Sequence, residues 1–290
     1  MYTTRASTHS WFNGAIGERE LGAPSVASIN FHLGTSVFDG LMAYWNDDHY
    51  YIHRGEEHLE RFKAGAARMG LDIHWSVDEM FHGIEELLEF EEHGTQYVRP
   101  IAYRRSPELW ITGNRDRPVD VSIFTVRVTR DSDLPISCHV SPIERISSRS
   151  IPGQTKVSGA YVNSFQARYA AELAGFEDGI MLDRDGRITE ASAANVFLIR
   201  DDQLLTPILT SDVFPGITRR VILEIARTER IELREAELRA DDLSKINGAF
   251  LCSTLMEIRS ISRIGTHELH TADQSAFMCV VKAFRELTHG

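Results

Sequence analysis

The segment IPGQTKVSGAY (151–161), followed further along by ITEASAANVF (188–197), decides the fold of this 290-residue chain. Lys156 lies in a Gly- and Ser-rich loop directly before a predicted helix. A lysine that acts as an amine nucleophile must reach a carbonyl while partly neutral, whereas most loop lysines are exposed charges. Glu190 ends a predicted strand among apolar neighbours, where a semi-buried carboxylate needs a cationic partner. A helix signal beside a strand signal indicates a mixed α/β class.

A third segment, FPGITRR (214–220), adds a possible anion site. Pro215 and Gly216 turn the chain, and Ile217 and Thr218 open an amphipathic helix. The free amides and the positive end of such a helix suit a phosphate, although ordinary capping by Thr218 explains the same pattern. The three segments together contain the parts that a phosphate-bearing aldehyde cofactor needs.

The composition excludes several classes of protein. With 42% hydrophobic and 25% charged residues, the chain is predicted to be globular, with room for one or two domains. Its 31 Lys and Arg against 42 Asp and Glu give a net charge of -11, which disfavours nucleic acid as a partner. No apolar run has the length of a membrane helix and the start lacks a signal-peptide core, so a cytoplasmic location is expected.

The motifs of several common enzymes are missing from the sequence. It contains no GxxxxGK[ST], GxSxG, HExxH or GxGxxG pattern, and its histidines lack the spacing of a metal site, so no metal is expected. The three cysteines lie far apart and are predicted to be buried small hydrophobes rather than disulfides.

Both halves of the chain mix strand and helix signals without regular alternation, which predicts a mixed α/β (α+β) fold. Asn13-Gly14 predicts a hairpin turn, and helical spacing of apolar residues begins near Glu56. The polar segment TRDSDLP (129–135) is predicted to be an interdomain linker. It would separate a small domain, 1–128, from a larger one, 136–290, that carries Lys156.

Read in order, these segments resemble the fold type IV pyridoxal-phosphate enzymes, and most closely the branched-chain amino acid aminotransferases. Tyr161 and Glu190 follow Lys156 at the spacing of that family. The segments that carry the resemblance, in the order of the family, are HLGTSVFDGLMAYW (32–45), EHLERF (57–62), YVRPI (97–101), TKVSGAY (155–161), ITEASAANVF (188–197), FPGITRR (214–220) and CSTLMEI (252–258).

The resemblance implies two α/β domains with pyridoxal 5'-phosphate between them, and a homodimer or larger assembly whose pockets borrow a loop across the dimer. Lys156 would form a Schiff base with the cofactor and carry the proton of the substrate Cα. Glu190 would pair with the pyridine nitrogen and keep it protonated, so that the ring accepts electrons. Tyr161 would hydrogen-bond the phenolic oxygen of the ring.

The resemblance also assigns the rest of the cofactor site. Arg61 would reach the phosphate with a charge-assisted fork. The amides of Ile217 and Thr218, together with Thr254, would complete the phosphate site, and Phe214 would pack on the face of the ring.

On the substrate side, the resemblance places Phe38, Tyr97, Arg99 and Leu255 in the pocket. In the family, the arginine receives the distal carboxylate of glutamate or 2-oxoglutarate, which favours glutamate as an amino donor. The chain departs from the family pattern at several pocket positions, which should reshape the pocket and leave the cofactor site intact. Those positions are Leu33, Met42, Val126, Thr129, Leu255 and Met256.

The sequence therefore predicts a pyridoxal-phosphate-dependent aminotransferase that moves an amino group between an apolar, branched-chain-like amino acid and 2-oxoglutarate. Three activities of the same fold stay open: an (R)-selective amine transaminase, a D-amino acid transaminase and an aminodeoxychorismate lyase. A non-catalytic cofactor-binding protein is a further alternative. The joint presence of Lys156, Tyr161 and Glu190 argues against it, because a silent relative has no need of both the proton carrier and the electron sink.

Overall fold

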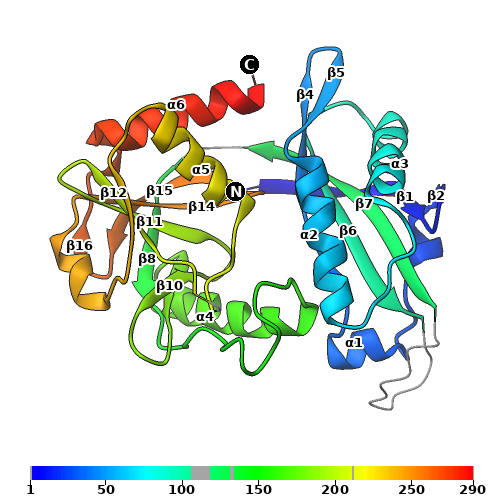
Figure 1. The fold of residues 1–290 in the computed structure, drawn as a ribbon, viewed down its shortest axis with the longest axis horizontal. Helices are drawn as coiled ribbons and strands as arrows, with labels where there is room; N and C mark the ends of the chain where they lie inside the picture. Colours follow the sequence, from blue (N-terminus) through cyan, green and yellow to red (C-terminus); the bar gives the residue numbers. More distant parts are fainter. Residues whose placement is uncertain (1, 106–117, 131–133, 211, 290) are drawn as a thin grey trace. The chain divides into compact units, whose positions relative to one another are not determined.

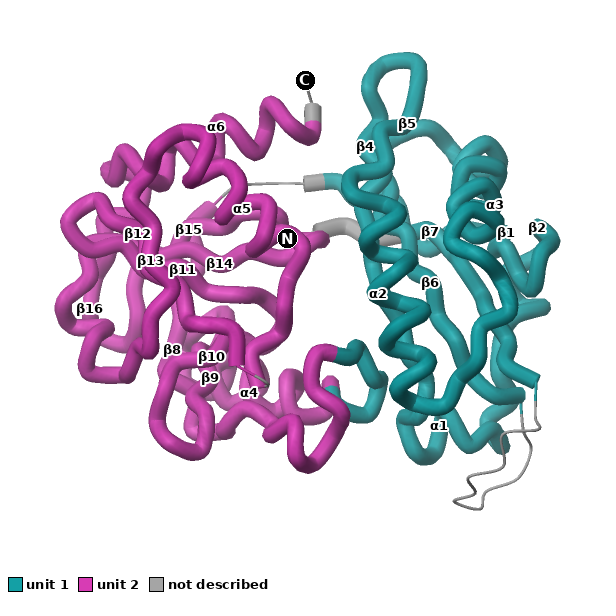
Figure 2. Tube along the Cα trace, in the orientation of Figure 1, with its two compact units in different colours: residues 1–132, 155–160 teal, residues 133–154, 161–290 magenta. Residues whose placement is uncertain are grey.

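The computed structural model describes residues 2–105, 118–130, 134–210 and 212–289. The chain forms two compact units, which Figure 2 colours separately. Unit 1 comprises Met1–Ser132 and Thr155–Ala160, and unit 2 comprises Asp133–Gln154 and Tyr161–Gly290. Residues 131–133 of the predicted linker lie outside the described residues.

Unit 1 is built on a seven-stranded sheet with the order β2-β1-β7-β6-β4-β5, and β3 pairs with β6. Its strand pairs are all antiparallel. The predicted turn at Asn13-Gly14 is confirmed: both residues have positive φ and join β1 to β2. The strands are β1 (Tyr2–Phe12), β2 (Ala15–Glu18), β3 (Val37–Phe38), β4 (Leu41–Asn46), β5 (His49–Ile52), β6 (Gln96–Arg104) and β7 (Val119–Arg130).

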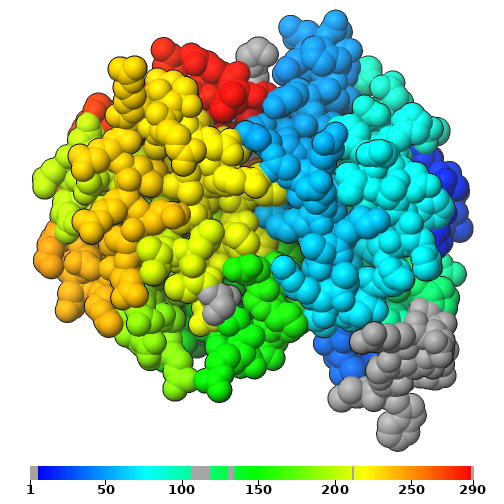
Figure 3. Space-filling view, viewed as in Figure 1, coloured from blue at the N-terminus to red at the C-terminus, as the bar shows by residue number. Residues whose placement is uncertain are grey.

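Two amphipathic helices pack on this sheet and on each other (Figure 1). Helix α2 (Gly55–Arg68) buries Leu59 and Phe62, and helix α3 (Val77–Glu89) begins with a capping box at Ser76. The outer side of α2, blue in Figure 3, is exposed. Unit 1 also contains α1 (Ile29–Leu33) and the 3-10 helices η1 (Arg19–Gly22) and η2 (Ser158–Ala160).

Unit 2 is built on a nine-stranded mixed sheet with the order β10-β9-β8-β15-β14-β11-β12-β13, and β16 pairs with β15. The pairs β8/β9, β8/β15 and β12/β13 are parallel, and the other pairs are antiparallel. The strands are β8 (Ile136–Val140), β9 (Asp178–Leu182), β10 (Ile188–Ala191), β11 (Asn195–Arg200), β12 (Gln203–Pro207), β13 (Leu233–Ala236), β14 (Gly248–Ser253), β15 (Glu257–Ile264) and β16 (His267–Glu268).

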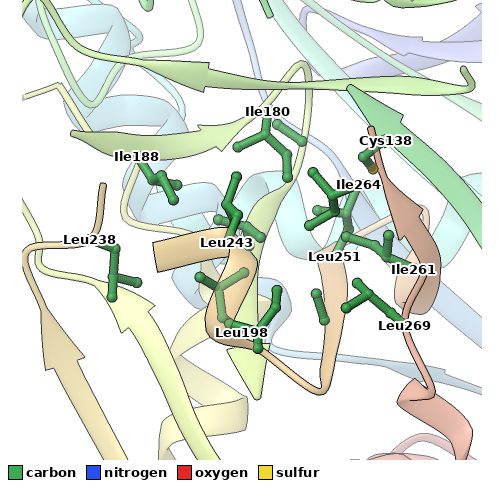
Figure 4. Packing of buried hydrophobic residues seen from close by; sticks show 14 of the residues in the cluster. Cys138, Ile180, Ile188, Leu198, Leu238, Leu243, Leu251, Ile261, Ile264 and Leu269 are labelled. Atoms are coloured by element: carbon green, nitrogen blue, oxygen red, sulfur yellow. The ribbon is translucent and has the colours of Figure 1, made fainter. Parts of the chain in front are cut away.

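Two apolar clusters stabilise this sheet. One joins Phe197 and Phe250 to helices α5 (Ile217–Thr228) and α6 (Ser275–His289). The other, which includes Leu198, Leu243 and Leu251, is shown in Figure 4. The remaining helices of unit 2 are α4 (Tyr161–Leu173), η3 (Ala240–Lys245) and η4 (Thr271–Asp273).

The compact units differ from the sequence-based division in the placement of Lys156. The sequence places this lysine in the C-terminal domain, but Thr155–Ala160 belongs to unit 1. The reason is a set of backbone contacts between this segment and residues 34–38, including an isolated bridge between Val157 and Val37.

The described residues test the expected burial of the cysteines. Burial is confirmed for Cys138 and Cys252 but is wrong for Cys279, which is half-buried. None of the described helices combines the length and hydrophobicity needed to cross a membrane. Across the same residues, His, Cys, Asp and Glu side chains form no group that would hold a metal ion.

Candidate active site

Lys156 is fixed to strand β3 in unit 1 through its backbone. The Phe38 amide donates to the Lys156 carbonyl at 3.0 Å, and the Ser158 amide donates to the Ser36 carbonyl at 2.9 Å. Gly34 and Gly159 allow this approach, because a Cβ on Gly34 would lie 2.7 Å from the Gly159 Cα. The predicted loop lysine is therefore held on a short strand pairing, which limits the positions its amine can sample.

Arg61 lies in a buried ion-pair cluster on the same unit. Its Nε and Nη2 donate to the two carboxylate oxygens of Asp39 at 2.8 and 2.7 Å, and His58 Nδ1 lies 2.9 Å from Asp39 Oδ1. Asp39 also accepts the Gly40 amide at 2.7 Å. This two-point contact fixes the plane of the guanidinium group.

The pKa values show how strongly these groups interact. Burial alone would raise the pKa of Asp39, but the Arg61 charge and the His58 hydrogen bond hold it well below its ordinary value. Burial lowers the pKa of His58, Asp39 opposes this change, and the charges of Arg61 and Lys156 lower it further. The charge of Lys156 thus acts on His58, and the Asp39 carboxylate faces the Arg61 guanidinium. Such a neighbourhood suits an anionic phosphate.

The candidate substrate residues of unit 1 share one face of its sheet. Met42 of β4, Tyr97 of β6 and Val126 of β7 are direct neighbours in the register, so their side chains form a row across three strands. Arg99 lies two residues beyond Tyr97 and faces the same side. Its guanidinium carbon lies 4.4 Å from the centroid of the Phe38 ring, and its Nη2 donates to the Tyr97 hydroxyl at 3.0 Å.

Gly40 makes room for this arrangement, because a Cβ there would overlap the Tyr97 hydroxyl. Two of the pocket departures lie elsewhere in unit 1. Thr129 pairs with Thr3 of β1, outside the row formed by Met42, Tyr97 and Val126, and Leu33 is 41% exposed at the end of α1.

Glu190 is the centre of the candidate site in unit 2. It is buried on β10, and Arg145 Nε lies 2.9 Å from its Oε1. Its Oε2 accepts the Phe214 amide at 3.0 Å and the Asn195 side-chain amide at 3.3 Å. The cationic partner that a buried Glu190 needs is therefore Arg145.

Asn195 joins Glu190 to the turn before helix α5. Its Nδ2 also donates to the Phe214 carbonyl at 2.9 Å, and a Cβ on Gly216 would overlap its Oδ1. Gly216 is the N-cap of α5, so capping by Thr218 is wrong: Thr218 is the second residue of the helix. A glycine N-cap has no side chain to bind the first-turn amides, which fits a helix start that holds a phosphate.

Thr254 and Leu255 lie in the turn between β14 and β15. Cys252, two residues before Thr254, pairs with Asn195 of β11, so this turn begins at the same end of the sheet as the Glu190 network. Tyr161 is the first residue of α4 and is half-buried.

Four residues of the Arg61 cluster and the Glu190 network were not predicted as site residues from the sequence. They are Asp39, His58, Arg145 and Asn195. Asp39, His58 and Asn195 lie in segments that carry the resemblance and Arg145 lies outside them, but no local pattern shows which groups they contact. A buried carboxylate at Glu190 predicts that a cation exists, and only the fold shows which arginine it is.

The residues of the two units fit pyridoxal phosphate. Unit 2 offers a buried, hydrogen-bonded carboxylate for a protonated ring nitrogen and an uncapped helix start for a phosphate. Unit 1 offers a lysine whose charge acts on His58 and an arginine whose orientation is fixed by Asp39.

Comparisons with known proteins agree with this chemistry. Residues 36–264 match the family model described as amino-transferase class IV. A probable branched-chain-amino-acid aminotransferase of Aquifex aeolicus is 30% identical over 267 residues, 90% of this chain and 85% of that protein.

Solved structures are similar over almost the whole chain. A branched-chain aminotransferase of Thermoproteus uzoniensis with norvaline has a TM-score of 0.90 at 27% identity, over 97% of this chain and 94% of that one. The T.th. branched-chain amino acid aminotransferase complexed with N-(5'-phosphopyridoxyl)-L-glutamate has a TM-score of 0.89 at 27% identity, with the same coverage of both chains.

Proposed function

Because this chain belongs to the class IV aminotransferase family, we propose that it transfers the amino group of an apolar, branched-chain-like amino acid to 2-oxoglutarate. It is a pyridoxal-phosphate-dependent transaminase with a fold type IV architecture. The observation that carries the proposal is the Glu190 network of unit 2, which joins a buried carboxylate to an uncapped helix start.

Pyridoxal phosphate, when bound, supplies an electron sink for the charge that a leaving Cα proton creates on the substrate. Lys156 would attach the cofactor covalently and then carry the proton from the substrate Cα to the cofactor carbon. Glu190 would hold the proton on the ring nitrogen, and Tyr161 would donate a hydrogen bond to the phenolic oxygen.

The proposed phosphate contacts are those that the resemblance implies. Arg61, oriented by Asp39, would supply charge-assisted hydrogen bonds. The amides of Ile217 and Thr218 would supply the helix start, and Thr254 would supply a hydroxyl.

The substrate proposal rests on the sheet face of unit 1. Arg99, held by the Tyr97 hydroxyl and the Phe38 ring, would receive the distal carboxylate of glutamate and 2-oxoglutarate. Met42 and Val126 in the same face would contact an apolar side chain, and Leu255 is the pocket residue proposed from the resemblance. The names of the relatives and the glutamate moiety of the phosphopyridoxyl-glutamate complex support these two substrate classes.

A homodimer or larger assembly is part of the proposal. Helix α4 exposes one apolar side over three turns, and such a continuous patch is rare on the free surface of a monomer. Its residues, between 48% and 72% exposed, are Val162, Phe165, Tyr169 and Leu173. Light scattering on the purified protein should give at least twice the chain mass, and Phe165→Glu should reduce it. The cytoplasmic location stays a prediction.

The activity is tested by incubating the purified protein with pyridoxal phosphate, L-leucine and 2-oxoglutarate. The proposal predicts glutamate and the 2-oxo acid of leucine in equal amounts, because each transferred amino group yields one of each. A lyase would form no glutamate. Glutamate formation with D-leucine or an (R)-amine in place of L-leucine would instead favour one of the other transaminases.

A further inference from the structure

Arg145 forms an ion pair with Glu190. The proposed cofactor and substrate contacts do not include this arginine. Its side chain is 15% exposed and that of Glu190 is 8% exposed. The arginine binds Oε1, whereas the Asn195 and Phe214 donors bind Oε2. The carboxylate is therefore held from two sides, with the cation on one side and neutral amides on the other.

Three contacts place Arg145 where it meets Glu190. Its own amide donates to the carbonyl of Leu182, the last residue of β9, at 2.8 Å. Asn163 of α4 binds the residues on either side: its Nδ2 donates to the Glu144 carbonyl at 2.8 Å, and its Oδ1 accepts the Ile146 amide at 2.9 Å. Tyr161, two residues before Asn163, belongs to the same helix. Helix α4 therefore carries the residue proposed to contact the cofactor ring and also holds the loop that contains Arg145.

Arg145 also links Glu190 to the segment that leads to the phosphate turn. Its Nε lies 3.3 Å from the Asp212 carbonyl, and the Ser148 amide donates to Asp212 Oδ1 at 2.7 Å. Asp212 is two residues before Phe214, whose amide binds Glu190. A shift of the arginine would therefore move the carboxylate relative to the start of α5.

The charge of Arg145 affects where a proton lies when Glu190 shares it with the ring nitrogen of the cofactor. A proton shared between Glu190 and a ring nitrogen has two positions, one on the nitrogen with an ionised carboxylate and one on the carboxyl group. Burial favours the uncharged carboxyl group, and a cation in contact with the carboxylate favours the ionised form. A cation in direct contact with the carboxylate stabilises the ionised form more than it repels a charge farther away at the nitrogen.

We propose that Arg145 is a positioning residue that keeps Glu190 ionised and oriented, so that the shared proton stays on the ring nitrogen of the cofactor. This inference rests on the proposed function, because it assumes that pyridoxal phosphate binds at Glu190. Arg145 itself would make no contact with the cofactor. It acts through the carboxylate, and Asn163 and Asp212 act through the arginine.

Stabilisation of the fold does not explain why Arg145 and Glu190 form a buried ion pair. A buried ion pair adds little net stability, since the cost of removing both charges from water offsets their attraction. An apolar side chain of similar length would fill the same space. Removing the arginine alone leaves the buried Glu190 carboxylate without this cation and costs stability, so unfolding is measured beside the cofactor readout.

The experiment compares Arg145→Met with Arg145→Lys, which keeps the charge, and with Arg168→Met, which removes an exposed ion pair from the same unit. Each protein is loaded with pyridoxal phosphate labelled with nitrogen-15 in the ring, and the ring-nitrogen resonance and the dissociation constant of the cofactor are measured. Thermal unfolding of each protein without added cofactor shows whether the variant folds. If Arg145→Met does not fold, Arg145→Gln takes its place.

The proposal predicts a protonated ring nitrogen in the wild type, in Arg145→Lys and in Arg168→Met, and an unprotonated one in Arg145→Met. The last variant should also bind the cofactor about tenfold more weakly. A wild-type resonance in a folded Arg145→Met protein would overturn the role of Arg145 and leave the proposed function intact. Failure of the wild type to bind pyridoxal phosphate would overturn the proposed function, and this inference with it.

Discussion

Arg61 and Asp39 form a two-point ion pair in unit 1, with Nε 2.8 Å from one carboxylate oxygen and Nη2 2.7 Å from the other. The pair joins helix α2 to the residue that follows strand β3. Because the Phe38 amide, next to Asp39, donates to the Lys156 carbonyl, Arg61 and Lys156 are both tied to the end of strand β3. The geometry of this ion pair leads to the first two predictions.

Asp39→Asn should weaken cofactor binding through its phosphate end. An amide cannot accept both guanidinium hydrogen bonds as a carboxylate does, so Arg61 loses its fixed orientation. We expect the dissociation constant for pyridoxal phosphate to rise about tenfold. Binding of pyridoxal, which has no phosphate, should change little, and equal losses for the two compounds would contradict the role of the pair. Asp48→Asn, at an exposed turn, is the matched control.

The same substitution should change the response of stability to acid. The pKa of Asp39 in the fold lies below its ordinary value of 3.8, so the stabilisation by its carboxylate is complete above that value and falls as the pH drops below it. Because Asp39 also opposes the lowering of the pKa of His58, the comparison is made in a His58→Gln background. There, the difference in unfolding free energy between the proteins with and without Asp39→Asn should be constant from about pH 7 to pH 5 and then decrease by at most about 1.4 kcal/mol per pH unit. Urea denaturation across this range measures it; a gap that widens in acid would refute the assignment.

Lys156→Ala should abolish covalent attachment of the cofactor. Borohydride treatment of the loaded wild type should fix the cofactor on the peptide that contains Lys156, because this is the amine proposed to form the Schiff base. Mass spectrometry of the digested protein measures the attachment. Lys63→Ala, on the same helix as Arg61, should label as the wild type does. Labelling of Lys156→Ala to the same extent at another lysine would show that the assignment of the nucleophile is wrong.

Arg99→Ala should separate the two substrate classes. Its guanidinium group is held by the Tyr97 hydroxyl and the Phe38 ring, ready for a carboxylate. We expect kcat/KM for 2-oxoglutarate to fall about 100-fold, as for the loss of a charge-assisted pair, and kcat/KM for a small apolar 2-oxo acid to fall much less. Steady-state kinetics with both acceptors measures this, with Arg127→Ala on the neighbouring strand as the control. An equal loss for both acceptors would argue against a carboxylate contact.

Local patterns predicted the elements that depend on nearby residues. Asn13-Gly14 predicts the first hairpin because the turn needs only positive φ at two adjacent positions. The apolar spacing of Leu59 and Phe62 predicts α2 in the same way, since one helix face is enough to define the period. The ordered motifs also predicted the family and its cofactor.

Local patterns did not predict the contacts between segments that are distant along the chain. Thr155–Ala160 joins unit 1 because it pairs with residues 34–38, more than 100 positions earlier, and no local signal encodes that pairing. The cation beside Glu190 is Arg145, on a loop 45 positions earlier, although many other arginines in the chain have the same local character. Asn195 lies within the segment ITEASAANVF. Only the fold shows that its side-chain amide donates to both Glu190 and the Phe214 carbonyl.

The most direct test of the proposed activity is a single-turnover experiment on the loaded protein without an acceptor. L-leucine, L-isoleucine and L-valine are mixed separately with it, as are D-leucine and (R)-1-phenylethylamine, and the visible absorbance of the cofactor is followed. If the proposed activity is right, the three L-amino acids remove this absorbance and 2-oxoglutarate then restores it. Loss of absorbance with D-leucine or the amine alone, or with no donor at all, would contradict it.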